Sequence, residues 1–395
     1  MSNYTGIHDF AGAIVLGIAA GGGGGITVGA SGTSEYPTTN YSSVGEAVAA
    51  GHNNIMVVSD TIETSTITVP TSGLLLKMEN ANVFLNGAGF SVPNLRELSI
   101  IGRGSITVTG SVAIITSLGT SNVYINGVDM DARALSSSAS PINSSTIGFV
   151  SLLNMSFYTS NGTTGLETAK GRIDNLKIIA AGTSTLRGIY CDGANSYIHN
   201  LEFANYGGGA QATIISGNKD GVTIDGVNLK DTAPTTLEIN VPGINFSLNN
   251  FNRHHGLLVL RAKSGLSISN SRAGFAAIGE AIENATFTNV VASGFRSLQV
   301  QNEFSNNNRY AACDLGVPSE PITTTPFTFW GNNNRFDATL FRQNVTMQGS
   351  GHILNGCDFL GDFTIATNSS GIILTDCRIR GTFTDNGTDT VGTTF

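Results

Sequence analysis

Most of the chain repeats a six-residue pattern of apolar and polar positions: apolar, any residue, a small turn-former, apolar, any residue, apolar. Within each copy the apolar residues alternate and then change phase at the turn-former, as in two short strands joined at a left-handed residue. Successive copies start 27 residues apart at Ile125 and Leu152, and 19 residues apart at Ile268 and Phe287. The copies are INGVDM from Ile125, LLNMSF from Leu152, IDNLKI from Ile173, IHNLEF from Ile198, IDGVNL from Ile224, LNNFNR from Leu248, ISNSRA from Ile268, FTNVVA from Phe287, LNGCDF from Leu354 and LTDCRI from Leu374.

A repeat of this length indicates a solenoid, and the absence of a helical period makes its elements strands. The repeat therefore predicts an all-β fold, a parallel β-helix whose coils stack about 4.8 Å apart, in preference to a β-sandwich. In such a stack Asn154, Asn175 and Asn200 would lie one above another at a turn. Cys357 and Cys377 would occupy equivalent inward positions as a stacked pair of buried thiols.

Two segments resemble a known family. YSSVGEAVAAGHNNIMVVSDTIETSTITVP (41–70) and RGIYCDGANSYIHNLEF (187–203) are similar to the opening module and the internal coils of the pectin-lyase-like β-helix superfamily, which includes bacteriophage tailspikes. The resemblance implies a right-handed parallel β-helix with a short amphipathic capping helix from Val44 to Ala50. It implies no activity, because the catalytic motifs of enzymes in that superfamily are absent and His52 lies in GHN rather than GHG.

The stretch AGAIVLGIAAGGGGGITVGA, residues 11–30, has no charge and holds eight glycines. A secretion signal needs a basic flank, and no Lys or Arg precedes Lys77. Each glycine costs about 1 kcal/mol relative to alanine in a helix, which disfavours a membrane-spanning helix. We therefore predict no secretion signal and no membrane insertion. We expect this stretch to lie outside the coils, with its apolar half buried against sister chains or a particle and its glycine run acting as a joint.

The chain divides into four predicted segments. The third holds Pro318, Pro321 and Pro326, and proline cannot sit inside a sheet ladder. The segments are an N-terminal attachment segment with a Gly-rich joint (1–42), the parallel β-helix (43–302), a Pro- and Asn-rich loop or interdomain linker (303–327), and terminal coils with a C-terminal cap (328–395).

Composition and charge exclude some classes of partner for this chain. Charged residues make up 12% of it, the net charge is −8, and no basic cluster occurs. The electrostatic footprint of a nucleic-acid-binding protein is therefore absent. Four cysteines are too few for a disulfide scaffold in 395 residues, which indicates assembly in a reducing compartment.

Each repeat has two outward positions, the second and the fifth, and titratable groups converge at one place. Asp174, His199 and Asp225 occupy the second position of three successive coils, with Glu202 close by. The two aspartates would lie about 9–10 Å apart, near the upper limit for the carboxylates of an inverting glycosidase. These four residues are the candidate catalytic groups. The alternative is a solvated face of mixed charge, in which Lys177 and Glu202 pair across strands. We commit none of them to catalysis and predict no cofactor and no metal site.

Three functions remain open. The first, which we expect, is a structural virion appendage of a bacteriophage, a homotrimeric tail spike, tail fibre or similar protein assembled in the host cytoplasm. It would dock on tail, neck or capsid proteins through residues 1–42 and project the β-helix toward a host glycan or receptor. The second is a polysaccharide-degrading hydrolase or lyase, for which the single Trp330 offers few platforms for sugar rings. The third is a bacterial surface adhesin.

Overall fold

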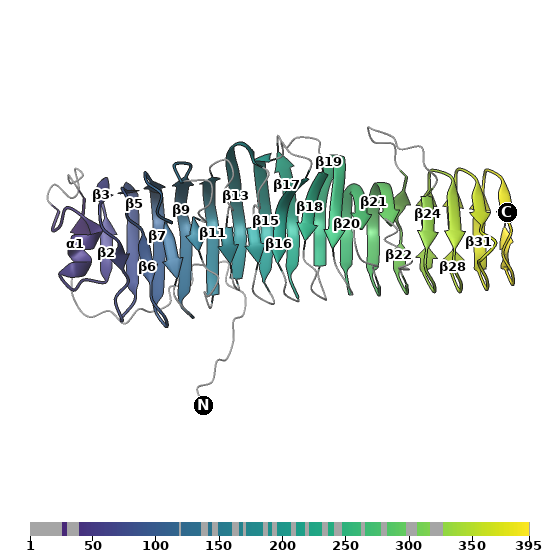
Figure 1. The fold of residues 1–395 in the computed structure, drawn as a ribbon, viewed down its shortest axis with the longest axis horizontal. Helices are drawn as coiled ribbons and strands as arrows, with labels where there is room; N and C mark the ends of the chain where they lie inside the picture. The colour runs from purple at the N-terminus through teal and green to yellow at the C-terminus, as the bar shows by residue number, and fades with distance from the viewer. Residues whose placement is uncertain are drawn as a thin grey trace, which may run out of the picture.

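The protein is an elongated stack of β-coils, each coil being one turn of the chain around the long axis (Figure 1). Every strand pair among the described residues is parallel, so the predicted parallel β-helix is confirmed. The computed structural model describes residues 26–29, 39–117, 120–135, 141–143, 149–159, 166–168, 171–184, 189–191, 196–206, 211–217, 221–230, 236–240, 247–261, 265–277, 283–297, 306–316 and 327–394.

The coils present three faces. The first face precedes the turn-former of each repeat and the second face follows it, and long strands run round the corner between them. These two faces are built by β2 (Asn54–Val57), β3 (Thr61–Glu63), β5 (Leu74–Leu85), β7 (Glu97–Val108), β9 (Asn122–Ala132), β11 (Phe149–Thr159), β13 (Gly171–Ser184), β15 (Tyr197–Tyr206), β17 (Thr223–Lys230), β19 (Ser247–Arg261), β20 (Ser267–Ala277), β21 (Thr286–Ser297), β22 (Arg309–Ala311), β23 (Asp314–Leu315), β25 (Arg335–Asp337), β26 (Leu340–Phe341), β28 (Ile353–Asn355), β29 (Asp358–Phe359), β31 (Ile373–Ile379) and β33 (Val391–Thr394).

The third face returns the chain to the next coil. The far ends of β19, β20 and β21 also belong to it, and β10 contacts β12 while β21 contacts β24. Its remaining strands are β4 (Ile67–Thr68), β6 (Phe90–Val92), β8 (Ile115–Ser117), β10 (Ile142–Asn143), β12 (Leu166–Thr168), β14 (Ile189–Cys191), β16 (Gln211–Gly217), β18 (Thr236–Asn240), β24 (Phe327–Trp330), β27 (Val345–Gln348), β30 (Phe363–Ile365) and β32 (Phe383–Asp385).

The turn between the first and second faces is made by one left-handed residue per coil. Asn154, Asn175 and Asn200 have φ near +50°, and the Nδ2 of each donates to a side-chain oxygen on the coil before it. This confirms the predicted asparagine stack. Gly127 and Gly226 occupy the same turn position with φ of 76° and 74°, where glycine meets no Cβ penalty.

Two coils lie in the part of the chain where the six-residue pattern lapses, between Phe287 and Leu354. There β22 with β23 and β25 with β26 carry the ladder from β21 to β28. Their turn residues are Ala312 and Ala338, with φ of 52° and 48°. Alanine rarely adopts this conformation, which explains why a search for Asn, Gly or Asp misses both coils. Within the predicted segment 303–327, residues 306–316 therefore belong to the stack, and the division into four segments stays a prediction.

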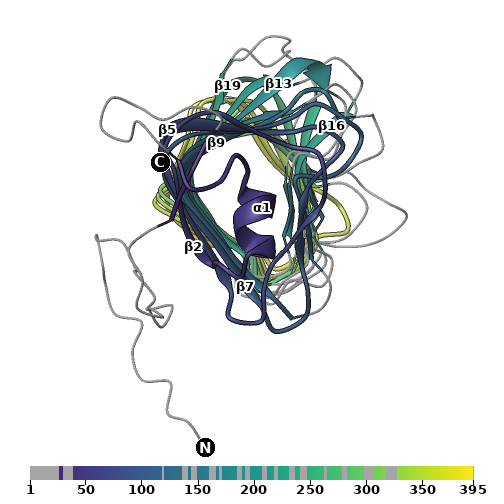
Figure 2. The same cartoon turned by 90° about the vertical axis from the view of Figure 1, so that its left-hand side faces the viewer.

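A short helix, α1 (Val44–Ala49), lies across the N-terminal opening of the stack (Figure 2). Ser43 is its N-cap, with Oγ accepting a hydrogen bond from the backbone N–H of Glu46 at 3.1 Å. Val44 and Ala47 are buried on the core side of the helix. The predicted capping helix is confirmed and ends one residue earlier than expected.

A buried carboxylate fixes this helix to the first coil. Glu63 of β3 is 2% exposed, and its oxygens accept hydrogen bonds from the backbone N–H groups of Val44 (2.6 Å) and Gly45 (3.0 Å). The Thr61 hydroxyl donates a hydrogen bond to Glu63 Oε1 at 3.4 Å. The N–H groups at a helix start have no partner within the helix, so a carboxylate from a neighbouring strand satisfies them.

The chain enters the stack before the helix. β1 (Ile26–Val28) pairs in parallel with β2, and Val28 is fully buried. The expectation that all of residues 11–30 lie outside the coils is therefore wrong for these strand residues, whose apolar–polar–apolar order fits an added strand. Residues 1–25 and 30–38 lie outside the described residues, so the attachment segment and its joint stay predictions.

Candidate functional site

The candidate site lies on the first face, where β13, β15 and β17 run side by side. Asp174, His199 and Asp225 are register partners on these strands, as the repeat predicts. The preceding residues Ile173 and Ile198 are buried, and the alternation of a strand therefore points the three polar side chains outward.

An aspartate orients the histidine at this site. His199 Nδ1 lies 2.8 Å from Asp174 Oδ1, and Arg172 Nη2 lies 3.4 Å from Asp174 Oδ2. The His199 side chain is 42% exposed and that of Asp174 21%. A carboxylate on Nδ1 fixes the imidazole ring and leaves Nε2 on its other edge, which is the geometry of an oriented proton acceptor or donor.

Tyr197 and Asp225 complete the cluster. The Tyr197 ring stacks on the His199 ring with centroids 6.1 Å apart and an interplanar angle of 17°. Partial burial, and then the charges of Asp225 and Asp174, raise the pKa of Tyr197 above its usual value, so its hydroxyl keeps its proton at neutral pH. Asp225 Oδ1 accepts a hydrogen bond from Asn250 Nδ2 at 2.5 Å.

Glu202 is engaged elsewhere. Its Oε1 lies 2.9 Å from Lys177 Nζ, which confirms the predicted cross-strand pair. Both residues follow the left-handed turns at Asn175 and Asn200, so they lie round the corner from His199. The structure thus joins Asp174 to His199, sets Asp225 in register beside His199, and pairs Glu202 with Lys177. We commit none of the four to catalysis, and they stay candidates.

Sequence reasoning missed a second outward surface, on the third face near the C-terminal end. We call it the threonine ladder: four register partners on β24, β27, β30 and β32 whose hydroxyls make no hydrogen bond to other described residues. Trp330 lies on the same side of β24, in register with Gln348 of β27. The signal was a short recurring motif, FTFW, VTMQ, FTI and FTD, outside the six-residue pattern. The ladder residues are Thr328, Thr346, Thr364 and Thr384.

A third surface is an apolar stripe on the first face of the last coils. Ile353, Ile373 and Val391 are register partners, and the latter two are 42% and 65% exposed. The same column carries the exposed Arg309 and Arg335 on earlier coils. The column therefore changes from charged to apolar where β28 begins.

In the described part of the chain, no group of three or more His, Cys, Asp or Glu side chains is arranged to hold a metal ion. None of its helices is both long enough and apolar enough to span a bilayer.

Comparisons with known proteins give no family for this chain. No protein-family model matches it, and no curated protein matches it. Two solved structures of PfbA, a surface adhesin of Streptococcus pneumoniae, align with it. The first has 10% sequence identity and a TM-score of 0.23 over 88% of this chain and 87% of that chain. The second has 11% identity and a TM-score of 0.20 over 89% and 92%. The fold therefore rests on the strand register itself: the chain is a parallel β-helix.

Proposed function

We propose that this chain is the rod of an attachment appendage, a β-helical spike or fibre of a bacteriophage virion, rather than an enzyme. The observation that carries the proposal is that outward charges of the described residues pair between neighbouring coils at several points along the rod. Lys177 binds Glu202 at 2.9 Å, Arg342 binds Asp314 at 2.6 Å, and Arg380 binds Asp358 at 2.7 Å. Together with the continuous parallel register, this makes a stiff rod whose surface groups serve the stack.

The rod is proposed to be a trimer, assembled in the host cytoplasm and docked on tail, neck or capsid proteins through residues 1–42. The apolar stripe of Ile353, Ile373 and Val391 supports self-association, because it runs along the rod axis and parallel copies can bury it against one another.

Light scattering on the purified full chain tests the trimer. We expect three times the chain mass at micromolar concentration, and dissociation when Ile373→Asp puts a charge into the stripe. The matched control is Ile62→Asp, since Ile62 is 61% exposed at the other end of the rod and should leave the trimer intact. A wild-type monomer at micromolar concentration contradicts the spike.

The host contact is proposed to be a neutral surface glycan bound along the threonine ladder. Trp330 supplies an aromatic platform, and the ladder hydroxyls recur about every 4.8 Å, close to the length of one sugar unit in an extended chain. We expect Trp330→Ala to weaken retention on immobilised host glycan at least about tenfold. Tyr197→Ala, an exposed aromatic on the first face, is the control and should bind normally.

Particle location separates a virion appendage from a bacterial adhesin, which would use the same rod on a cell surface. We expect antibody against the β-helix to label purified phage particles, and deletion of residues 1–25, which stops short of β1, to remove the label from the particles while the rod still folds. Labelling of bacterial cells in the absence of phage would support the adhesin.

The oriented Asp174–His199 pair favours one alternative, a polysaccharide-degrading enzyme. Incubation with host capsule or lipopolysaccharide, scored for released oligosaccharide, tests it. Release that is lost in both Asp174→Asn and Asp225→Asn would establish the enzyme. Glycan binding without release supports the attachment rod.

A further inference from the structure

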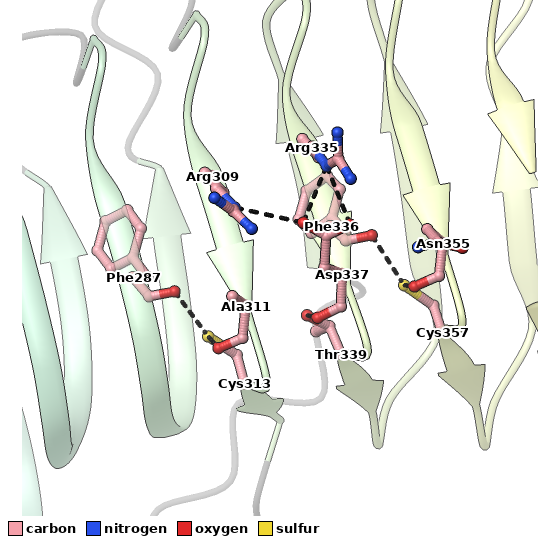
Figure 3. A network of polar contacts seen from close by, with 10 residues as sticks. All are labelled: Phe287, Arg309, Ala311, Cys313, Arg335, Phe336, Asp337, Thr339, Asn355 and Cys357. Carbon is pink, nitrogen blue, oxygen red and sulfur yellow. Dashed lines mark hydrogen bonds and ion pairs between the residues drawn. The ribbon is translucent and has the colours of Figure 1, made fainter.

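A column of small hydroxyl and thiol side chains lines the inside of the stack immediately after the left-handed turn. Each member donates to the backbone oxygen two residues before it, so the side chain closes the turn from within. Cys313 and Cys357 also donate to oxygens on the preceding coil, of Phe287 and Phe336, as Figure 3 shows. The members are Ser271, Cys313, Thr339, Cys357 and Cys377.

Only two thiols in this column are consecutive. Cys357 and Cys377 precede the register partners Asp358 and Arg378, which places them on adjacent coils at the same position. Thr339 occupies that position between Cys313 and Cys357. Cys313 is therefore two coils from the nearest thiol, while Cys357 and Cys377 are one coil apart.

The separation of this pair suits a covalent bond. Adjacent coils lie about 4.8 Å apart, which places the Cα atoms within the roughly 4.4–6.8 Å range of a disulfide, while the Cβ atoms must approach to within about 4.5 Å for the bond to form. Both side chains are almost fully buried, at 1% and 0% exposed. Both sulfur atoms lie in the interior of the stack, where each donates to backbone oxygens of its own coil and of the coil before it.

The pKa values of Cys357 and Cys377 also differ from that of Cys313, because the surroundings of the thiols differ. Burial raises the pKa of Cys313 to about 11, so it stays a thiol. Hydrogen bonding from Cys357 lowers the pKa of Cys377, while the same contact and burial raise the pKa of Cys357. Cys377 is therefore the thiol of the pair that forms a thiolate more readily.

We propose that Cys357 and Cys377 are a modification site, which a small disulfide such as oxidised glutathione converts into a disulfide joining two consecutive coils. The Cys377 thiolate attacks one glutathione sulfur and expels glutathione thiolate, which takes up a proton. The Cys357 thiol then loses its proton and attacks Cys377 Sγ, expelling the second glutathione. Two protein thiols are oxidised and one glutathione disulfide is reduced to two glutathiones.

Access to the buried pair comes through the coil that covers it. β33 pairs with β31 over Cys377, and this coil is loosely packed: Val391 is 65% exposed and all of β32 is exposed. Local opening of a poorly buried coil costs less than global unfolding, so the oxidant reaches Cys377 before Cys313. The proposal does not depend on the attachment function.

The experiment compares the folded full chain after incubation with oxidised glutathione or with dithiothreitol near pH 7.5. We expect the thiol titre in denaturant to fall from four to two, the intact mass to fall by about 2 Da, and peptide mapping to find Cys357 joined to Cys377. The melting temperature should rise by a few degrees, because the bond closes a loop.

Single substitutions make the outcome specific. Cys313→Ser should still form the bond. Cys357→Ser should instead accumulate a glutathione adduct on Cys377, since the second thiol is missing. Circular dichroism checks that each variant folds. Four free thiols in the wild-type chain after prolonged oxidation, or a bond that uses Cys313 or Cys191, would overturn the proposal even if no variant could be purified.

Discussion

The two ends of the rod hold equivalent coils together by different chemistry. In the N-terminal coils, Leu76, Ile100 and Ile125 stack in register as an aliphatic column, which α1 and the buried Glu63 close off. Further along the same column, the register partners Phe287, Tyr310 and Phe336 stack ring on ring, with centroids 4.8 and 4.6 Å apart. The last coils add rings on the other two faces: Phe341 stacks on Phe359 of the next coil at 4.6 Å, and Phe363 on Phe383 at 5.6 Å, where Phe383 is 38% exposed.

This difference shows that a coil accepts either aliphatic or aromatic core residues. Both ends share the left-handed turn and the alternation of inward and outward side chains. Which residue fills the core depends only on how it packs against the neighbouring coils. The same comparison shows one end sealed by a helix and the other presenting exposed apolar groups.

Removing a buried ring or a buried aliphatic side chain should have the largest effect. We expect Phe359→Ala to lower the free energy of unfolding by about 3–5 kcal/mol and Leu76→Ala by about 2–5 kcal/mol, because each leaves a cavity. Hydrogen exchange should locate each loss in the coils next to the substitution. A loss of protection spread evenly along the rod would contradict independent coils.

Glu63 tests the sealed end. Glu63→Gln keeps the size of the side chain but loses the charge-assisted bonds to the backbone of Val44 and Gly45, which should cost about 1–3 kcal/mol. Exchange should rise in α1 and β2 and stay unchanged in β28 and β31. The control, Glu97→Gln, removes a carboxylate from the same end without a helix to cap.

His352 should make the C-terminal coils sensitive to acid. The side chain is fully buried, Nε2 lies 3.3 Å from the Gln348 carbonyl oxygen, and Nδ1 accepts from the Asn334 N–H. Burial lowers the pKa of His352, so the folded state favours the neutral ring. The unfolded chain takes up a proton near pH 6.5, so stability is full above that pH and falls below it, by up to about 1.4 kcal/mol per pH unit, until the lowered pKa is reached. Urea midpoints between about pH 7.5 and 5.5 measure this slope, and His352→Gln should flatten it.

An ion pair between coils should matter least. Arg342 binds Asp314 through Nε at 2.6 Å and Nη2 at 2.8 Å, but it is exposed. We expect Arg342→Gln to lower stability by less than about 1 kcal/mol, and by less still in 1 M salt. A loss as large as that of Phe359→Ala would mean that surface charge, not the core, holds these coils together.

The sequence predicted the features that are set by contacts between one coil and the next. The columns through Asp174, His199 and Asp225 and the stack of asparagine turns follow from a repeat whose period fixes the register. Two coils escaped because Ala312 and Ala338 adopt a conformation that alanine disfavours, which the stack imposes on them.

Other features depend on contacts that no local pattern encodes. Residues 26–28 are too short a run for their sequence to predict a strand. They form one because they pair with the edge of β2. The threonine ladder lies on the third face, where no turn-former marks the repeat. Exposure of Ile373 and Val391 is likewise a property of the assembled end.

The turn at one left-handed residue has a consequence for how long such a rod can become. Each coil brings its own turn and bonds only to the coils above and below it, so length is counted in whole coils. Duplication of one coil, such as residues 353–372, would move everything beyond it by about 4.8 Å and alter neither end. The length of the rod is therefore set by the number of coils that the sequence encodes.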